Sequence, residues 1–220
     1  MKNKRLFIFD MDGVLLDSEP YWRAAQIDLL DQFGVRISSE DCIRNTMGKR
    51  IDDIATFWID EFCLNVEPEY FATLLLKTTA GLIRQNAKAN PGLYSLIEFL
   101  QQHSFVIALA TSSSKEIITA VLQKLQLEDV FAVTVSADSV KRGKPAPDVY
   151  LNVCARLNIS TEYALALEDS LTGVKSALAA NITTIAIPET GNANVDLADF
   201  SSADFIVSRI DDVIKLLERD

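Results

Sequence analysis

The chain has 220 residues, 49% of them hydrophobic, which is enough for one large domain or for a core domain with a smaller insert. Its 31 acidic and 21 basic residues give a formal net charge of −10, which would repel nucleic acids and anionic membrane surfaces over most of the exterior. We therefore expect neither nucleic acid nor a membrane as a partner, although a local basic pocket for a small anion is still allowed.

Targeting and redox signals are weak in this sequence. The basic start is followed by an apolar stretch, 6–9, that is far too short for a signal peptide, and no run approaches the roughly 18 apolar residues of a membrane span. The cysteines, Cys42, Cys63 and Cys154, are odd in number and widely spaced. This predicts a cytoplasmic protein whose cysteines are buried free thiols. Since His103 is the only histidine, proton transfer and metal binding must fall to carboxylates.

The first predicted element is the apolar run 6–9, typical of a strand buried on both faces of a parallel sheet, and it ends at the acidic turn Asp10-Met11-Asp12-Gly13. Between about residues 20 and 88 only helical spacing is found, with breaks at Gly34, Gly48 and Pro68. We expect helices there over 21–33, 51–62 and 70–85.

After Asn90-Pro91-Gly92 the predicted strands and helices alternate. The expected strands are 105–110, 132–135, 164–167, 183–187 and 205–206, and the expected helices are 93–102, 115–125, 148–157, 171–180 and one from 211 onward. Residues 189–194 are expected to form a loop.

This order predicts an α/β protein with a Rossmann-like doubly wound parallel sheet. Residues 1–15 and 90–220 would form this core domain, and residues 16–89 an all-helical cap domain inserted after the first strand. Because ligands of such sheets bind outside the carboxyl ends of the strands, the cap should lie over the site.

The first acidic turn places Asp10 and Asp12 two residues apart at the end of a buried strand. If the extended conformation persists, both carboxylates project to one side, and two like charges that close need a cation. A surface turn without function could carry the same residues. A calcium loop is excluded, because its fifth and twelfth positions would be Val14 and Tyr21, which offer no suitable ligand.

A run of hydroxyl side chains, Thr111-Ser112-Ser113-Ser114, lies between a predicted strand and a predicted helix. Hydroxyls and backbone N–H groups at such a turn can bind phosphate oxygens. Alternatively, Ser113 and Glu116 are spaced as in a capping box, which would give the run a purely structural role.

Two further motifs follow predicted strands. Gly143-Lys144-Pro145 holds a lysine in a stiff loop, where it could neutralise a phosphoryl group, although a Lys-Pro pair is also common in solvated turns. Glu168 and Asp169 follow another apolar strand. The positive end of the next helix would account for one acid at this position, but two adjacent acids favour metal ligation. Oxygen ligands together with a phosphate substrate indicate Mg²⁺. Together the four motifs are far more specific than any one, because their strand ends share one edge of the sheet.

In this order, Asp10-x-Asp12-Gly13-Val14, Thr111, Lys144 and Glu168-Asp169 resemble the four motifs of the haloacid dehalogenase superfamily, in its phosphatase branch with a helical C1 cap. The resemblance covers essentially the whole chain. Residues 9–20 with Trp22, and residues 143–148, are most similar to the bacterial sugar phosphatases of the hexitol phosphatase and 2-deoxyglucose-6-phosphatase group.

The resemblance implies a Mg²⁺-dependent phosphomonoesterase for a small sugar or sugar-alcohol phosphate. Asp10 would form an aspartyl-phosphate, and Asp12 would act as general acid and base. The implied Mg²⁺ ligands are Asp10, the Asp12 backbone carbonyl, Asp169 and, directly or through water, Glu168. The implied phosphate-binding residues are Thr111, Ser112 and Lys144.

Specificity is expected in the cap, where the candidates are Glu19, Trp22, Lys49 and Arg50. The two cations could meet a polyol or a second anionic group, unless they are merely solvated, and Trp22 could instead belong to the cap core. The expected partner is a small phosphorylated metabolite, and the resemblance favours a monomer.

Three other enzyme types share parts of this pattern. A phosphomutase of the β-phosphoglucomutase kind carries a cap histidine where this chain has Trp22, and a phosphoglycolate-type phosphatase shares all the motifs. A dehalogenase would lack the second acid, Asp12. A catalytically silent binding module is a further alternative, although every motif position here holds a competent residue.

Overall fold

The computed structural model describes residues 3–188 and 196–219, so the loop expected over 189–194 lies outside the described residues. Within the described part of the chain, no helix combines the length and the apolar character needed to cross a membrane.

The core of the molecule is a parallel sheet, with strands in the order β3-β2-β1-β4-β5-β6 among the described residues. Their bounds are β1 (Leu6–Phe9), β2 (Val106–Thr111), β3 (Val133–Ser136), β4 (Ala164–Glu168), β5 (Thr183–Ala186) and β6 (Phe205–Ile206). The chain builds one side of the sheet outward from β1 and then returns to build the other. The predicted doubly wound parallel sheet is confirmed, and its switch point lies at β1, where such sheets bind ligands.

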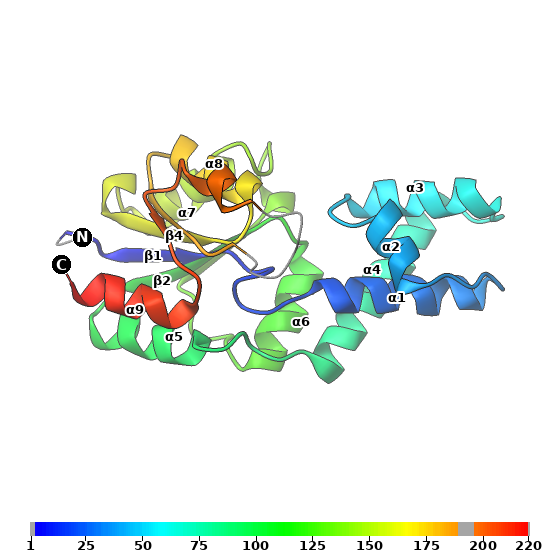
Figure 1. The fold of residues 1–220 in the computed structure, drawn as a ribbon, viewed down its shortest axis with the longest axis horizontal. Coiled ribbons are helices and arrows are strands. Elements are labelled where there is room, and N and C mark those ends of the chain that lie inside the picture. The colour runs from blue at the N-terminus through cyan, green and yellow to red at the C-terminus, as the bar shows by residue number, and fades with distance from the viewer. Residues whose placement is uncertain (1–2, 189–195, 220) are drawn as a thin grey trace.

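Helices cover both faces of the sheet (Figure 1). On one side lie α5 (Leu93–Gln102), α6 (Lys115–Leu125) and α9 (Ile210–Glu218), and on the other lie α7 (Asp148–Leu157) and α8 (Leu171–Ala179). All four residues of β1 are buried: Phe7 and Phe9 join the first core, while Leu6 and Ile8 join the second. This is the alternation expected of a strand between two helical layers.

A run of helices separates β1 from β2 in the chain, as predicted for an insertion. It begins with α1 (Glu19–Gln32), α2 (Ser39–Asn45), α3 (Ile51–Phe62) and α4 (Pro68–Asn86). These four helices stand apart from the sheet (Figure 1) and share their own hydrophobic cluster, which contains Trp58, Phe71 and Leu75. The chain returns through α4, which packs along α6.

Helix α2 was not among the predicted helices. It has seven residues, too few to show a helical period, and Cys42 is its only buried side chain. The Ser38 hydroxyl accepts a bond from the Asp41 backbone N–H, and the Asp41 carboxylate accepts one from the Ser38 N–H. This capping box stabilises the first turn and was the one local pattern that could have revealed the helix.

The three cysteines are free thiols, and Cys42 and Cys154 are buried as predicted, but the expectation that Cys63 is also buried is wrong. Burial raises the pKa of both Cys42 and Cys154 to about 11, whereas Cys63 is exposed. Only the thiolate is nucleophilic, so burial and the raised pKa together keep these two thiols unreactive near neutral pH. We expect a disulfide reagent to modify Cys63 alone in the native protein and all three thiols in denaturant. Native labelling of Cys42 at the rate of Cys63 would contradict the packing of the inserted helices.

Candidate active site

The register of the sheet brings the motif residues to one level. Phe9 of β1 pairs with Leu109 of β2 and Leu167 of β4, so the residues that follow, Asp10, Ala110 and Glu168, lie side by side at the carboxyl edge. The Asp10 backbone N–H continues the ladder by donating to Leu167 O at 3.0 Å.

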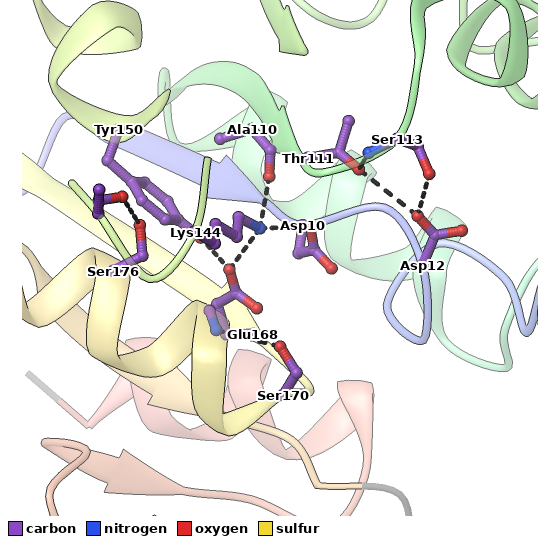
Figure 2. Close-up of polar contacts among 12 residues, drawn as sticks. Asp10, Asp12, Ala110, Thr111, Ser113, Lys144, Tyr150, Glu168, Ser170 and Ser176 are labelled. Atoms are coloured by element: carbon purple, nitrogen blue, oxygen red, sulfur yellow. Dashed lines mark hydrogen bonds and ion pairs between the residues drawn. The ribbon is translucent and has the colours of Figure 1, made fainter. Parts of the chain in front are cut away.

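Lys144 joins these three strand ends from the loop before α7. Its Nζ lies 2.6 Å from Asp10 Oδ1, 2.6 Å from Glu168 Oε1 and 2.9 Å from Ala110 O (Figure 2). The side chains are 4%, 9% and 0% exposed for Lys144, Asp10 and Glu168. Burial opposes the lysine charge, but the attraction of both carboxylates outweighs it and holds the pKa of Lys144 above its usual range.

The cluster has more acids than Lys144 can neutralise. Asp10, Glu168 and Asp169 each offer a carboxylate oxygen within 4.8 Å of the others. Burial, reinforced by the charge of Glu168, raises the pKa of Asp169 to about 8, and burial also raises the pKa of Asp10 well above its usual range despite Lys144. Such crowding favours a bound cation.

The donor set fits a hard divalent cation. All three neighbouring side chains offer oxygen atoms, which suit Mg²⁺ better than a softer metal. In addition, Glu168 Oε2 is buried and has no hydrogen-bond partner among the described residues. A buried carboxylate oxygen without a partner is unfavourable, and a cation would satisfy it.

Asp12 is held separately from this cluster by hydroxyl groups (Figure 2). Ser18 donates to its Oδ1 at 2.5 Å, and Ser113 donates to its Oδ2 at 2.6 Å, with Thr111 at 3.5 Å from the same oxygen. Ser136 supports the arrangement by donating to Ser113 O at 2.7 Å. The hydroxyls orient the carboxylate next to the cleft, where it can exchange a proton with a bound molecule.

The capping-box interpretation of Ser113 and Glu116 is wrong. Helix α6 is capped by Ser114, and no side-chain cap bond is formed there. Because the helix begins one residue later than that spacing requires, the Ser113 hydroxyl is turned toward Asp12 instead.

Two glycines allow the acidic groups to approach the backbone. Gly13 has a φ of 75°, and a Cβ there would lie 2.0 Å from Asp169 Oδ2. A Cβ at Gly173, in the first turn of α8, would lie 1.8 Å from Glu168 Oε2. Any side chain at either position would therefore displace a carboxylate of the candidate metal site.

A cleft of about 730 Å³ lies between the inserted helices and the sheet edge, a size suited to a small metabolite. Its lining includes all four cap candidates, Glu19, Trp22, Lys49 and Arg50, together with Asp12, Ser112 and Lys144. The other predicted site residues lie at the strand ends: Asp10, Thr111, Glu168 and Asp169. Lys144, which lines the cleft, is bonded through its ammonium to Asp10 and Glu168. The structure thus brings every predicted site residue to one region.

Three cap candidates also have structural partners. Trp22 is partly buried and packs against the hydrophobic cluster of the inserted helices as well as the core cluster that contains Phe9. Lys49 Nζ lies 4.9 Å from the centre of the Phe57 ring, and the Glu19 carboxylate lies 3.7 Å from the Arg23 guanidinium. Arg23 itself lines the cleft, although the sequence patterns did not single it out.

A family model for haloacid dehalogenase-like hydrolases matches residues 7–187. The chain belongs to this family. Hexitol phosphatase B of Escherichia coli K12 is 31% identical over 182 residues, 82% of each chain. The phosphorylated carbohydrates phosphatase of Thermotoga maritima is 34% identical over 178 residues, 81% of this chain and 82% of that protein. A solved Thermotoga maritima structure with the provisional name β-phosphoglucomutase has a TM-score of 0.84 and 30% identity, and the match covers 98% of this chain and 99% of that one.

Several residues of this haloacid dehalogenase-like hydrolase that shape the site were not predicted from the sequence. They are Ser18, which donates to Asp12 as Ser113 of the predicted hydroxyl run does, Tyr150, whose hydroxyl donates to Glu168 Oε1, and Gly173, which makes room for that carboxylate. Serine, tyrosine and glycine carry no distinctive spacing, so only the three-dimensional contacts identify them.

Proposed function

We propose that this hydrolase is a Mg²⁺-dependent phosphomonoesterase for small sugar or sugar-alcohol phosphates. The observation that carries the proposal is the buried Lys144 ammonium bonded to Asp10 and Glu168, with Asp12 held separately at the adjoining cleft. The names of the two relatives, a hexitol phosphatase and a phosphorylated carbohydrates phosphatase, support this substrate class.

In the first step, an Asp10 carboxylate oxygen forms a bond to phosphorus while the bond from phosphorus to the substrate oxygen breaks. Asp12 gives its proton to the leaving alkoxide. In the second step, water attacks phosphorus, Asp12 takes up the proton of the water, and the bond to Asp10 breaks to release phosphate. Lys144 neutralises Asp10 and the phosphoryl group, while Thr111 and Ser112 orient phosphoryl oxygens.

Asp10, Asp169 and Glu168 would hold Mg²⁺, with the Asp12 backbone carbonyl as a further ligand. When bound, the cation supplies positive charge that offsets the repulsion between the nucleophile and the phosphate dianion. In the same proposal, residues 16–89 form the cap domain over a core of residues 1–15 and 90–220, and the four cap candidates contact the sugar part of the substrate.

A phosphomutase is the second candidate, because the structural relative from Thermotoga maritima carries such a provisional name. Product analysis separates the two activities: a phosphatase releases inorganic phosphate, whereas a mutase returns an isomeric sugar phosphate.

The substrate class is tested by comparing kcat/KM in Mg²⁺ for hexose phosphates, hexitol phosphates, phosphoglycolate and β-glucose 1-phosphate. We expect phosphate release, with hexose or hexitol phosphates preferred. Preference for phosphoglycolate would contradict the substrate class, and conversion of β-glucose 1-phosphate without phosphate release would contradict the phosphatase reaction.

The role of the Asp12 hydroxyl contacts gives a separate prediction. Ser113→Ala removes the 2.6 Å bond to Asp12 Oδ2 and should lower kcat by roughly fivefold, the equivalent of about one hydrogen bond. Ser114→Ala is the matched control, because the Ser114 hydroxyl has no partner in the described structure. Equal kcat values for the two variants, measured at saturating substrate, would show that Ser113 does not orient Asp12.

A further inference from the structure

The two oxygens of the Glu168 carboxylate have different surroundings. Oε1 accepts bonds from the Lys144 ammonium and from the Tyr150 hydroxyl (Figure 2). Oε2 is buried and has no hydrogen-bond partner among the described residues. One oxygen therefore anchors the side chain, and the other is left for a cation.

Tyr150 is well suited to fix this orientation. It lies in the first turn of α7 and is 0% exposed, packed in the hydrophobic cluster on that face of the sheet with Ile8 and Ala166. Because its ring is held by packing, its hydroxyl stays at one place, and rotation of the Glu168 carboxylate away from it would break the bond. The Lys144 ammonium lies 5.4 Å from the ring centre, a contact that a phenylalanine would keep.

The other side of the same carboxylate is closed by α8. A Cβ at Gly173 would lie within 2.3 Å of both carboxylate oxygens, so the helix backbone lies directly against the group. Between this backbone and the Tyr150 hydroxyl, the carboxylate has little freedom to turn.

We propose that Tyr150 is a positioning residue of the metal site: its hydroxyl fixes Oε1 of Glu168 and thereby directs Oε2 to the cation. The inference rests on the metal site of the proposed function. The ring alone would fill the same space, so the hydroxyl is the group to test. Removing a group that orients a metal ligand typically lowers the affinity for the metal by about 10- to 100-fold.

The test is a Mg²⁺ titration followed by thermal unfolding, which reports binding without turnover because a ligand of the native state raises Tm. For Tyr150→Phe we expect the Mg²⁺ Kd to rise about tenfold. At saturating Mg²⁺, kcat should return to within about threefold of the wild-type value, since the substitution leaves every group of the reaction in place.

Tyr94→Phe is the control, because it also removes one tyrosine hydroxyl, which donates to Leu125 O at 3.1 Å; Tyr94 is an exposed residue of α5 and lies away from the site. It should leave the Mg²⁺ Kd unchanged. If Tyr150→Phe binds Mg²⁺ as tightly as the wild type, the positioning role is wrong while the metal site stands, even if Tm falls in EDTA. If Mg²⁺ does not stabilise the wild type, the metal site of the proposed function is wrong and this inference fails with it.

Discussion

Asp10→Asn should reduce kcat by roughly 10⁴-fold or more at saturating substrate and Mg²⁺, the scale of loss found when a nucleophile is removed. An asparagine amide cannot form the phosphoryl-enzyme bond, and it weakens the contact made at 2.6 Å with the Lys144 ammonium. The measurement is phosphate release from the preferred sugar phosphate, with thermal unfolding to verify that the variant is folded.

Asp17→Asn is the matched control for this substitution. Asp17 is an exposed acid seven residues further along, and its carboxylate accepts a bond only from the nearby Glu19 backbone N–H among the contacts of the described residues. Its kcat should stay close to that of the wild type. Retention of more than a few per cent of wild-type activity in folded Asp10→Asn would show that another group attacks phosphorus.

Lys144→Met should have the largest effect on stability. It leaves the Asp10 and Glu168 carboxylates without the cation between them, in surroundings where both are almost fully buried. Removing one partner of a buried ion pair typically lowers the free energy of unfolding by about 3–5 kcal/mol, and we expect that loss in EDTA. Mg²⁺ should restore part of it by supplying charge to the same acids.

The activity of Lys144→Met should fall by about 100-fold or more, because the nucleophile and the phosphoryl group lose a neutralising charge. Urea unfolding in EDTA and in Mg²⁺ measures the stability, with Lys141→Met as the control, since Lys141 is exposed in the same loop. If the two variants unfold at the same urea concentration, the buried ion pairs do not stabilise this fold.

Most of the fold was predictable because buried parallel strands have a strong local pattern. Leu6–Phe9 is wholly apolar and stops at an acid, and the predicted bounds of α3, α5, α6 and α7 agree with the structure. Helix α2 was missed because its seven residues contain one buried side chain, so its formation depends on a capping box and on packing against the other inserted helices.

The acidic and hydroxyl motifs of the site were predictable because they follow strand ends. The order of the chain places Asp10, Thr111 and Glu168 at one edge once the sheet is parallel, and this needs no side-chain detail. The contacts of Tyr150 and Gly173 with Glu168 depend instead on how α7 and α8 pack on the sheet, which periodicity cannot specify.

The central claim, that the phosphoryl group passes through Asp10, is tested most directly by mass spectrometry of the Asp12→Asn variant after acid quenching. With an aryl phosphate, the leaving group needs no proton, so the first step should proceed, whereas release of phosphate lacks its general base. We predict that the peptide containing Asp10 gains the mass of one phosphoryl group in Mg²⁺ and gains nothing in EDTA. An unmodified peptide in a variant that still releases the aryl alcohol, or a phosphoryl group on another residue, would contradict the account.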